Sequence, residues 1–587
     1  MTEISLPQVM AQADALSAQG DIPAAVACYR DWLASHAPED ISRHVALFNL
    51  GVLLRNVGQV DEAIDCYREA LKLKPDLYQA AVNLGLAFEA KGNRLDAAQT
   101  WIGALQPIEG QVLLLNHLGR VMETAVLLDD AEKYLQRSLL LSPDQPDAVQ
   151  HYLYIRQKQC KWPVVQSLPG LSEEKQLEYC GPLGVLALTD DPALQLKTIQ
   201  DWISRHLPNK FTHLSPTSGY GHERIRIGYM SCDFRWHAVS ILTAELFELH
   251  DRNRFEIYGI DFTPGADDSM RQRVLAAMDH HLPIHTLTDD QAAQLIRQNE
   301  IDILVDLTGL TSGSRYGILA YKPAPIQVSY LGFVGTCGMP EVDYILADRF
   351  VFPQELKPHF VEKPLYLPNV YQVNDSKRVI GQTPNRESCG LPGDAFVYCS
   401  FNGSYKITPE IFACWMRILR RVPNSVLWLG ADNQWARANL KEAAVRQGID
   451  AGRLVFAEKA PPAEYLARYR VADLLLDTSP YNAGTTASDA LWAGLPVLTC
   501  PGRSFASRMA GALLTAVNMG ELITHSLREY EQKAVSLAGK AGGYQRLRNH
   551  LAQEREHSAL FDAPRLVRDL EGLFEGLVNK LDDKVSQ

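Results

Sequence analysis

The sequence predicts an array of α-helical repeats followed by two α/β domains with parallel sheets. Three observations support this: a 34-residue repeat within the first 150 residues, short apolar runs that alternate with helical stretches from residue 224 onward, and a polar stretch with Pro and Gly that separates two sets of these runs. A length of 587 residues also suits three or four domains of roughly 100–200 residues each.

The composition is that of a folded chain without a polyanionic partner. Hydrophobic residues make up 46% and charged residues 21%, which is usual for globular domains. The 57 Lys and Arg against 69 Asp and Glu give a net charge of −12, so no general positive field attracts nucleic acid or an anionic membrane. The start lacks the pattern of a signal peptide, and no apolar run approaches the ~20 residues of a spanning helix. We therefore expect a cytoplasmic protein with no nucleic-acid and no membrane partner.

The ten cysteines are predicted to be reduced and structural. None forms a C-x-x-C pair, and most stand inside apolar runs, as small core residues do.

Residues 1–150 carry the repeats. Asn49-Leu50-Gly51, Asn83-Leu84-Gly85 and His117-Leu118-Gly119 are spaced by 34 residues, the tetratricopeptide period. Gly and Ala at fixed positions allow two antiparallel helices to approach, and Pro ends the second helix. With a less regular first unit, about four repeats form a continuous core and a concave face. That face can hold peptides or partner proteins, and the array can equally be a rigid spacer or a dimerisation arm.

The rest of the chain divides into a connector and two halves. Residues 151–220 contain two helical segments and a run of turn formers, which predicts a helical connector. Residues 221–385 form a first Rossmann-like half and residues 386–587 a second, with a linker over residues 374–394. The predicted strands are 225–230, 255–260, 303–306, 327–331 and 344–346, then 395–401, 426–429, 454–456, 474–477 and 497–499. Ligands of such sheets bind at the carboxyl ends of the strands.

The segment from Leu474 to Thr499 is the most informative motif. A strand ends at Asp477, a loop follows, and a helix begins near Thr485. Free amides of its first turn, with the hydroxyls of Thr485 and Thr486, make an anion site that fits a diphosphate. Asp489, about one turn further, can accept the hydroxyls of a ribose. The alternatives are that the threonines only cap the helix and that Asp489 only interacts with its dipole.

Two further side chains follow predicted strands. Lys406 can neutralise a leaving diphosphate, or it is an ordinary surface lysine. His237 can orient an acceptor hydroxyl or take its proton, or it is a satisfied structural histidine. The chain has no Asp-x-Asp and no zinc-type spacing of His and Cys, so metal-free chemistry is expected. Kinase, serine hydrolase and zinc-enzyme motifs are also missing.

The combination resembles the O-GlcNAc transferases, glycosyltransferase family 41. Matching motifs run in order through nearly the whole chain: Arg226-Ile-Gly-Tyr, Ser231-Cys-Asp-Phe with His237, Pro323-Ala-Pro-Ile-Gln, Leu331-Gly332, Tyr405-Lys406-Ile, Thr485-Thr486 with Asp489, and Leu491-Trp-Ala-Gly. The resemblance implies two facing Rossmann-like halves of the GT-B type and inverting transfer of GlcNAc from UDP-GlcNAc to Ser or Thr hydroxyls of proteins. It implies no cofactor beyond the donor substrate.

The resemblance also assigns site residues by position. Lys406 would meet the diphosphate, Thr485 and Thr486 the phosphates, Asp489 the ribose, Arg468 the uracil and His237 the acceptor. The candidate catalytic residues are thus His237 and Lys406, and the candidate sugar-nucleotide residues are Leu331, Gly332, Tyr405, Lys406, Tyr465, Arg468, Tyr481, Gly484, Thr485, Thr486 and Asp489.

Several positions depart from the family pattern. Gly403 and Gly484 replace a Gln and a His of the animal members, Pro462 stands in place of a nucleotide-contacting Lys, and Tyr465 replaces a His but can stack on a base. The Ala-Gly-Thr-Thr sequence also looks like that of Spindly, a relative that uses GDP-fucose. Transfer of fucose or glucose, transfer to a non-protein acceptor, and a repeat scaffold with a decayed site therefore stay as alternatives.

Overall fold

The computed structural model describes residues 4–105, 110–208, 211–265, 267–430, 432–539 and 543–583. The chain divides into two compact units. The first comprises Met1–Ile155 and Gln166–Glu173, and the second comprises Arg156–Val165 and Glu174–Gln587. The predicted connector, residues 151–220, is thus shared between the two units.

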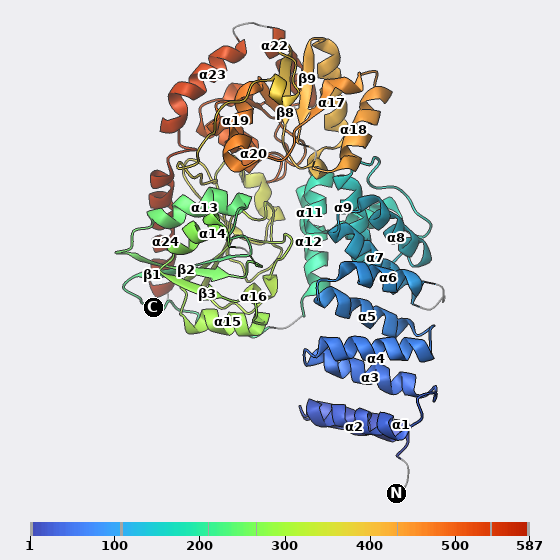
Figure 1. Ribbon diagram of the computed structural model, residues 1–587. Helices are drawn as coiled ribbons and strands as arrows, with labels where there is room; N and C mark the ends of the chain where they lie inside the picture. The colour runs from blue at the N-terminus through green and yellow to red at the C-terminus, as the bar shows by residue number, and fades with distance from the viewer. Residues whose placement is uncertain are drawn as a thin grey trace. The chain divides into compact units, whose positions relative to one another are not determined.

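The first unit consists of antiparallel helix pairs stacked on one another (Figure 1). Its helices are α1 (Leu6–Ala18), α2 (Ile22–Ser35), α3 (Arg43–Asn56), α4 (Val60–Leu73), α5 (Tyr78–Ala90), α6 (Arg94–Gly103), α7 (Gln111–Thr124) and α8 (Leu128–Leu141), and α9 (Pro146–Lys158) leads out of it. The predicted repeats are confirmed.

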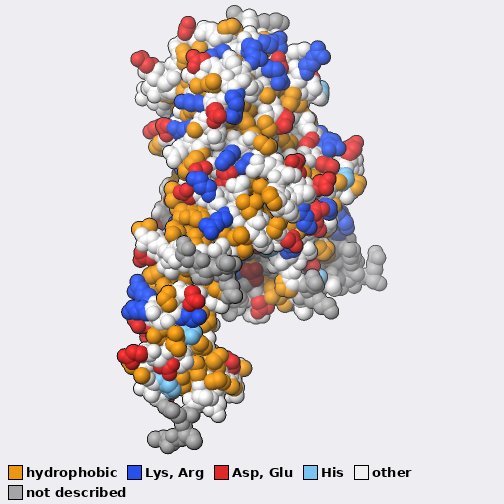
Figure 2. Space-filling model, turned by 90° about the vertical axis from the view of Figure 1, so that its right-hand side faces the viewer, with side chains coloured by type: hydrophobic (Ala, Val, Ile, Leu, Met, Phe, Trp, Pro, Cys, Tyr) orange, Lys and Arg blue, Asp and Glu red, His pale blue; other side chains and the backbone are white. Residues whose placement is uncertain are grey.

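Figure 2 shows hydrophobic, acidic and basic side chains intermixed on one face of the molecule.

The repeated glycines have a steric reason. A Cβ atom at Gly85 would lie 2.2 Å from the ring of Trp101, and one at Gly51 would lie 2.7 Å from the ring of Tyr67. Both aromatic side chains are fully buried between the paired helices. Glycine at these positions therefore lets the two helices of a repeat close on an aromatic residue.

The second unit contains two parallel sheets, as predicted. The first has the order β3-β2-β1-β4-β5-β6-β7 and the second β10-β9-β8-β11-β12. The strands are β1 (Ile225–Ser231), β2 (Phe255–Asp261), β3 (His280–Pro283), β4 (Ile303–Asp306), β5 (Ile326–Ser329), β6 (Tyr344–Ala347), β7 (Lys363–Tyr366), β8 (Phe396–Ser400), β9 (Ser425–Leu429), β10 (Leu454–Phe456), β11 (Leu474–Leu476) and β12 (Val497–Leu498). The sequence analysis missed β3 and β7. Both are edge strands with exposed positions, so neither has the continuous apolar run of an inner strand.

Helices cover both sheets. They are α10 (Glu173–Tyr179), α11 (Gly181–Leu188), α12 (Pro192–His206), α13 (Ala238–Leu249), α14 (Ser269–Ala276), α15 (Asp289–Gln298), α16 (Tyr316–Ala320), α17 (Pro409–Arg421), α18 (Gln434–Arg446), α19 (Pro462–Arg468), α20 (Thr485–Trp492), α21 (Met509–Ala516), α22 (Leu527–Gly539), α23 (Gly543–Glu554) and α24 (Ala563–Asp583). No helix among the described residues is long and apolar enough to span a membrane.

The last helix joins the second half of the chain to the first. Helix α24 runs beside α13 (Figure 1). Glu571 of α24 accepts hydrogen bonds from His250 Nδ1 at 3.0 Å and from the amide of Asp251 at 2.9 Å. Glu571 and His250 are both buried. Helix α24 therefore packs with the first sheet, although it follows the second sheet in the sequence.

The polar stretch 374–394 is not a solvated linker at its start. Asn374 and Asp375 are each 1% exposed. The guanidinium of Arg273 binds the two carboxylate oxygens of Asp375 at 2.5 and 3.1 Å. The polar composition here reflects buried ion pairs, which a sequence pattern does not distinguish from solvation.

Candidate donor site and acceptor side

A carboxylate at the end of β11 shapes the loop that precedes α20. Asp477 Oδ1 accepts hydrogen bonds from the amides of Thr478 at 2.8 Å and Ala483 at 2.7 Å, and Oδ2 accepts one from the hydroxyl of Thr499 at 2.6 Å. Burial raises the pKa of Asp477 to about 7. The loop of residues 478–484 is therefore fixed to the sheet at both of its ends.

Lys406 follows β8 and is held against this loop. Its ammonium donates to the carbonyl of Asn482 at 3.1 Å and lies 3.7 Å from the centre of the Tyr481 ring. The ring of Tyr405 meets that of Tyr481 edge-on at 6.0 Å. Burial lowers the pKa of Lys406 to about 8, and the nearby Asp477 opposes this shift. Lys406 is thus not the ordinary surface lysine that the sequence left open.

The N-terminus of α20 carries no capping side chain. Gly484 precedes the helix, and no side-chain hydrogen bond caps it among the described residues. Thr485 and Thr486 are partly exposed in its first turn. Since neither threonine acts as the N-cap, the amides of Thr485 and Thr486 and both hydroxyls remain available to an anion, whereas the amide of Ala487 donates to the carbonyl of Gly484 at 3.1 Å.

Asp489 lies one turn beyond Thr485 and has a partner that the sequence analysis missed. It is 7% exposed, and Nη1 of Arg378 donates to its Oδ1. Burial raises the pKa of Asp489, while Arg378 opposes the rise. Arg378 belongs to the polar stretch 374–394, more than a hundred residues away in sequence, so no local signal pointed to it.

Two hollows adjoin at Tyr465, and the candidate residues for the base and the ribose line them. One, of about 350 Å³, is lined by Trp236, Pro462, Tyr465 and Asp489 among others. The other, of about 560 Å³, lies at the carboxyl ends of β8, β9 and β10, and its lining includes Phe401, Tyr465 and Arg468. The hydroxyl of Tyr465 is 2.7 Å from that of Tyr469. The predicted base- and ribose-contacting residues therefore face neighbouring spaces.

His237 begins α13 in the first half. Its ring accepts a hydrogen bond from the amide of Val239 at 3.4 Å, and its Nδ1 lies 3.3 Å from Asp233. Burial lowers the pKa of His237, which favours the neutral imidazole. The histidine has a structural role as a helix cap, and the adjacent Trp236 lines the same 350 Å³ hollow as Asp489. The loop that carries His237 therefore reaches the hollow lined by the candidate ribose residue Asp489.

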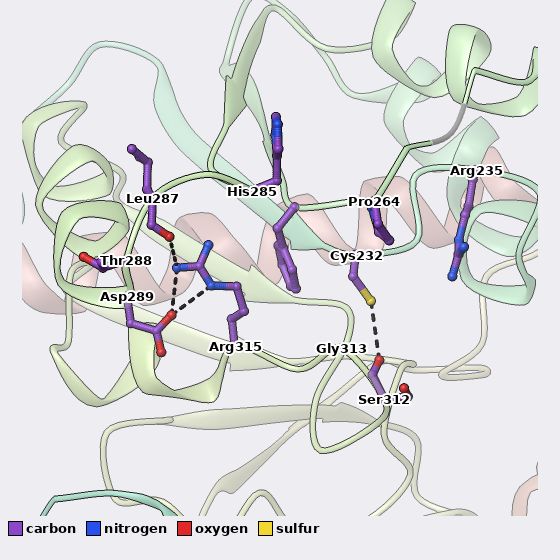
Figure 3. Close-up of a pocket in the computed structure, with 11 residues that line it drawn as sticks. Cys232, Arg235, Pro264, His285, Leu287, Thr288, Asp289, Ser312, Gly313 and Arg315 are labelled. Carbon is purple, nitrogen blue, oxygen red and sulfur yellow. Dashed lines mark hydrogen bonds and ion pairs between the residues drawn. The ribbon is translucent and has the colours of Figure 1, made fainter. Parts of the chain in front are cut away.

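A further hollow of about 490 Å³ opens beside this loop (Figure 3). Arg315 lies at one end of it, where its guanidinium binds Asp289 at 2.7 Å and the carbonyls of Ile284 and Leu287. Arg235 lies at its other end, and its guanidinium binds Asp233 at 3.1 Å, the carboxylate that also faces His237. Asp233 thus connects Arg235, which lines this hollow, to His237 on the predicted acceptor side.

Leu331 and Gly332 follow β5 and position two loops. Leu331 has a positive φ of 60°, and a Cβ at Gly332 would lie 2.1 Å from the carbonyl oxygen of Leu307. The loops after β4 and β5 therefore pack closely here. No hydrogen bond, ion pair or ring contact joins these two residues to the other candidates among the described residues.

The described residues contain no cluster of three or more His, Cys, Asp or Glu side chains arranged to hold a metal ion. All ten cysteines are free.

Two family models match parts of the chain, and a solved structure matches most of it. The model of glycosyl transferase family 41 matches residues 194–385 and 381–570, and a tetratricopeptide repeat model matches residues 44–77. The O-GlcNAc transferase of Thermobaculum terrenum, solved as a lysine-to-methionine mutant, is 26% identical, with a TM-score of 0.67, over 92% of this chain and 98% of that one.

Curated relatives match about three fifths to two thirds of the chain. The probable UDP-N-acetylglucosamine–peptide N-acetylglucosaminyltransferase SEC of Arabidopsis thaliana is 38% identical over 407 residues, 66% of this chain and 42% of the relative. The Caenorhabditis elegans UDP-N-acetylglucosamine–peptide N-acetylglucosaminyltransferase is 27% identical over 60% of this chain and 40% of its own. The relative named SPINDLY from Arabidopsis thaliana is 30% identical over 61% and 40%. The chain spans about two fifths of the length of these relatives.

Proposed function

The chain belongs to glycosyl transferase family 41, and we propose that it transfers GlcNAc from UDP-GlcNAc to Ser or Thr hydroxyls of proteins with inversion at the sugar. The observation that carries the proposal is the position of Lys406, whose ammonium is held on the carbonyl of Asn482 in the loop that leads into the uncapped N-terminus of α20. This arrangement suits a diphosphate leaving group. The names of the relatives and of the solved neighbour support the same reaction.

The donor half supplies charge stabilisation. As the bond between the anomeric carbon and the diphosphate breaks, the electron pair leaves with UDP. Lys406, the amides of α20 and the hydroxyls of Thr485 and Thr486 would stabilise the negative charge that develops there. Asp489 would hold the ribose, while Tyr465 and Arg468 would hold the base.

The first half supplies the acceptor side. The acceptor hydroxyl would attack the opposite face of the sugar and lose its proton. His237 stands on the loop that reaches the donor hollow. Its lowered pKa keeps the imidazole neutral, and because Nδ1 accepts from the amide of Val239, the proton is on Nε2, which can donate a hydrogen bond to that hydroxyl and orient it. We assign His237 the role of orienting the acceptor.

The proposal includes a metal-free donor site. Lys406 and the helix amides already supply positive charge at the position of the diphosphate, so a divalent ion has no necessary task there. The repeats are proposed to hold acceptor proteins or peptides, and a homodimer through the repeats stays a hypothesis. Ten free cysteines suit a reducing compartment, which favours the cytoplasm.

Calorimetric titration with UDP and GDP in parallel tests the donor assignment. We expect UDP to bind at least about ten times more tightly than GDP, a difference of about 1.4 kcal/mol. Guanine adds a second ring and an exocyclic amine, and Glu464 next to Tyr465 points roughly 100° away on the helix and cannot serve that amine. Tighter binding of GDP would favour the fucosyltransferase alternative. No binding of either nucleotide would contradict the proposed function.

A further inference from the structure

Arg378 is a buried arginine with an unused hydrogen-bond donor. Its side chain is 6% exposed, and Nη1 is bound to Oδ1 of Asp489. Nη2 is buried and has no hydrogen-bond partner among the described residues. A buried donor without an acceptor is costly, so an arginine in this state is suited to a ligand that completes its hydrogen bonding.

The carboxylate of Asp489, which Arg378 binds, has an unused hydrogen-bond acceptor. Oδ2 of Asp489 accepts no hydrogen bond in the described part of the chain, and Asp489 lines the hollow of about 350 Å³. The pair thus offers one free acceptor and one free donor. A sugar hydroxyl both donates and accepts, so the neighbouring hydroxyls of a ribose match this pair.

We propose that Arg378 is a donor-binding residue that holds the ribose of the sugar nucleotide together with Asp489. Arg378 fixes one carboxylate oxygen, Asp489 accepts from a ribose hydroxyl with the other, and Nη2 donates to the ribose. This inference rests on the proposed function, because it takes the ligand of the hollow to be a nucleoside diphosphate sugar.

The neighbours of Arg378 hold it in place from both halves of the unit. Residues 375–377 are bound to the first half: Asp375 pairs with Arg273, the amide and hydroxyl of Ser376 donate to Glu245 at 2.6 and 2.9 Å, and Lys377 pairs with Glu248 at 2.5 Å. On the other side, the indole of Trp492 in α20 donates to the carbonyl of Arg378 at 3.3 Å. The guanidinium is therefore presented to Asp489 by a segment that has little freedom to move away.

The arrangement also accounts for a departure in the sequence. Pro462, which stands in place of a nucleotide-contacting Lys of the family, lines the same hollow as Arg378. Arg378, from the polar stretch 374–394, thus supplies a positive charge at this hollow, where Pro462 of α19 supplies none.

Calorimetry with UDP and with 2′,3′-dideoxy-UDP tests the assignment on the full chain. The wild type is expected to bind UDP about 10- to 100-fold more tightly than the dideoxy nucleotide, because hydrogen bonds to charged groups are strong. Arg378→Gln should weaken UDP about tenfold while leaving the dideoxy nucleotide within about twofold. A structural role alone would weaken both nucleotides by the same factor.

Two further variants complete the design. Arg386→Gln makes the same substitution in the same polar stretch, but Arg386 pairs with Asp473 at 2.8 Å and lines neither donor hollow, so UDP affinity should stay within about twofold. Arg378→Lys keeps the charge if the Gln variant does not fold, and it should still lose part of the preference for UDP, since a lysine cannot donate to two partners in the same plane. An undiminished preference for UDP over the dideoxy nucleotide in a folded Arg378 variant overturns the inference, whereas a wild type that does not bind UDP contradicts the proposed function itself.

Discussion

At the scale of single residues, the candidate donor site contains two charged groups that are buried from water, Lys406 and Asp477. Lys406 has a pKa near 8 because burial disfavours its ammonium, and Asp477 close by has a pKa near 7 because burial disfavours its carboxylate. A bound diphosphate would bring the anion that Lys406 lacks. Binding of the nucleotide and protonation of this lysine should therefore be coupled.

Removal of that ammonium should affect the chemical step most. Lys406→Ala is expected to lower transfer by roughly two to three orders of magnitude, the usual cost of losing a preorganised charge at a leaving group. Single-turnover transfer measures this effect, with circular dichroism as the check on folding. A turnover close to that of the wild type would exclude Lys406 from the mechanism.

The pH dependence of UDP binding gives a separate prediction for the same residue. As the pH rises through about 8, Lys406 loses its proton, so UDP affinity should fall on the alkaline side. Lys406→Arg stays charged and should show little change over the same range. Calorimetry at about pH 7 and about pH 9 compares the two proteins, and parallel pH profiles would show that another group is responsible.

Tyr465 provides the prediction for the base. Its ring lies between the two hollows, so Tyr465→Ala should weaken UDP by about 1 to 3 kcal/mol if the base stacks there. The same titrations measure this loss. An unchanged affinity would place the base elsewhere.

At the scale of helices and strands, apolar periodicity was enough to predict most of the second unit. Inner strands such as β1 and β4 are buried runs, while β3 and β7 escaped prediction because an edge strand is polar on its open side. The candidate site was predicted where residues follow strands or open a helix, as for Lys406 and Thr485. Arg378 was not predictable in this way, since its partner Asp489 is brought to it only by the tertiary fold.

The helix pairs of the repeats give a test of packing. Gly85→Ala places a methyl group 2.2 Å from the ring of Trp101, and we expect it to lower the free energy of unfolding of the repeats by about 1 to 3 kcal/mol. Gly103→Ala in the next helix meets no atom within 4 Å and should leave stability unchanged or slightly raised. Urea unfolding of the two variants measures the difference, and equal midpoints would contradict the steric account.

At the scale of the whole molecule, the chain combines a unit of repeats with a unit that contains every candidate donor residue. Repeats contact mainly their neighbours in such arrays. Removal of residues 1–150 is therefore expected to leave UDP affinity nearly unchanged while transfer to protein acceptors falls. Calorimetry and transfer assays on a truncated protein with intact circular dichroism test this. Lost nucleotide affinity would mean that the repeats help to build the donor site.

The mass of an acceptor protein after incubation with UDP-GlcNAc tests the proposed transfer of GlcNAc to protein hydroxyls. We expect one or more N-acetylhexosamine residues to be added on Ser or Thr, in the presence of EDTA as well as in its absence, and to be lost with Lys406→Ala. An acceptor left unmodified by UDP-GlcNAc but modified with GDP-fucose would overturn the donor assignment, and a modification that needs added magnesium or manganese would overturn the metal-free site.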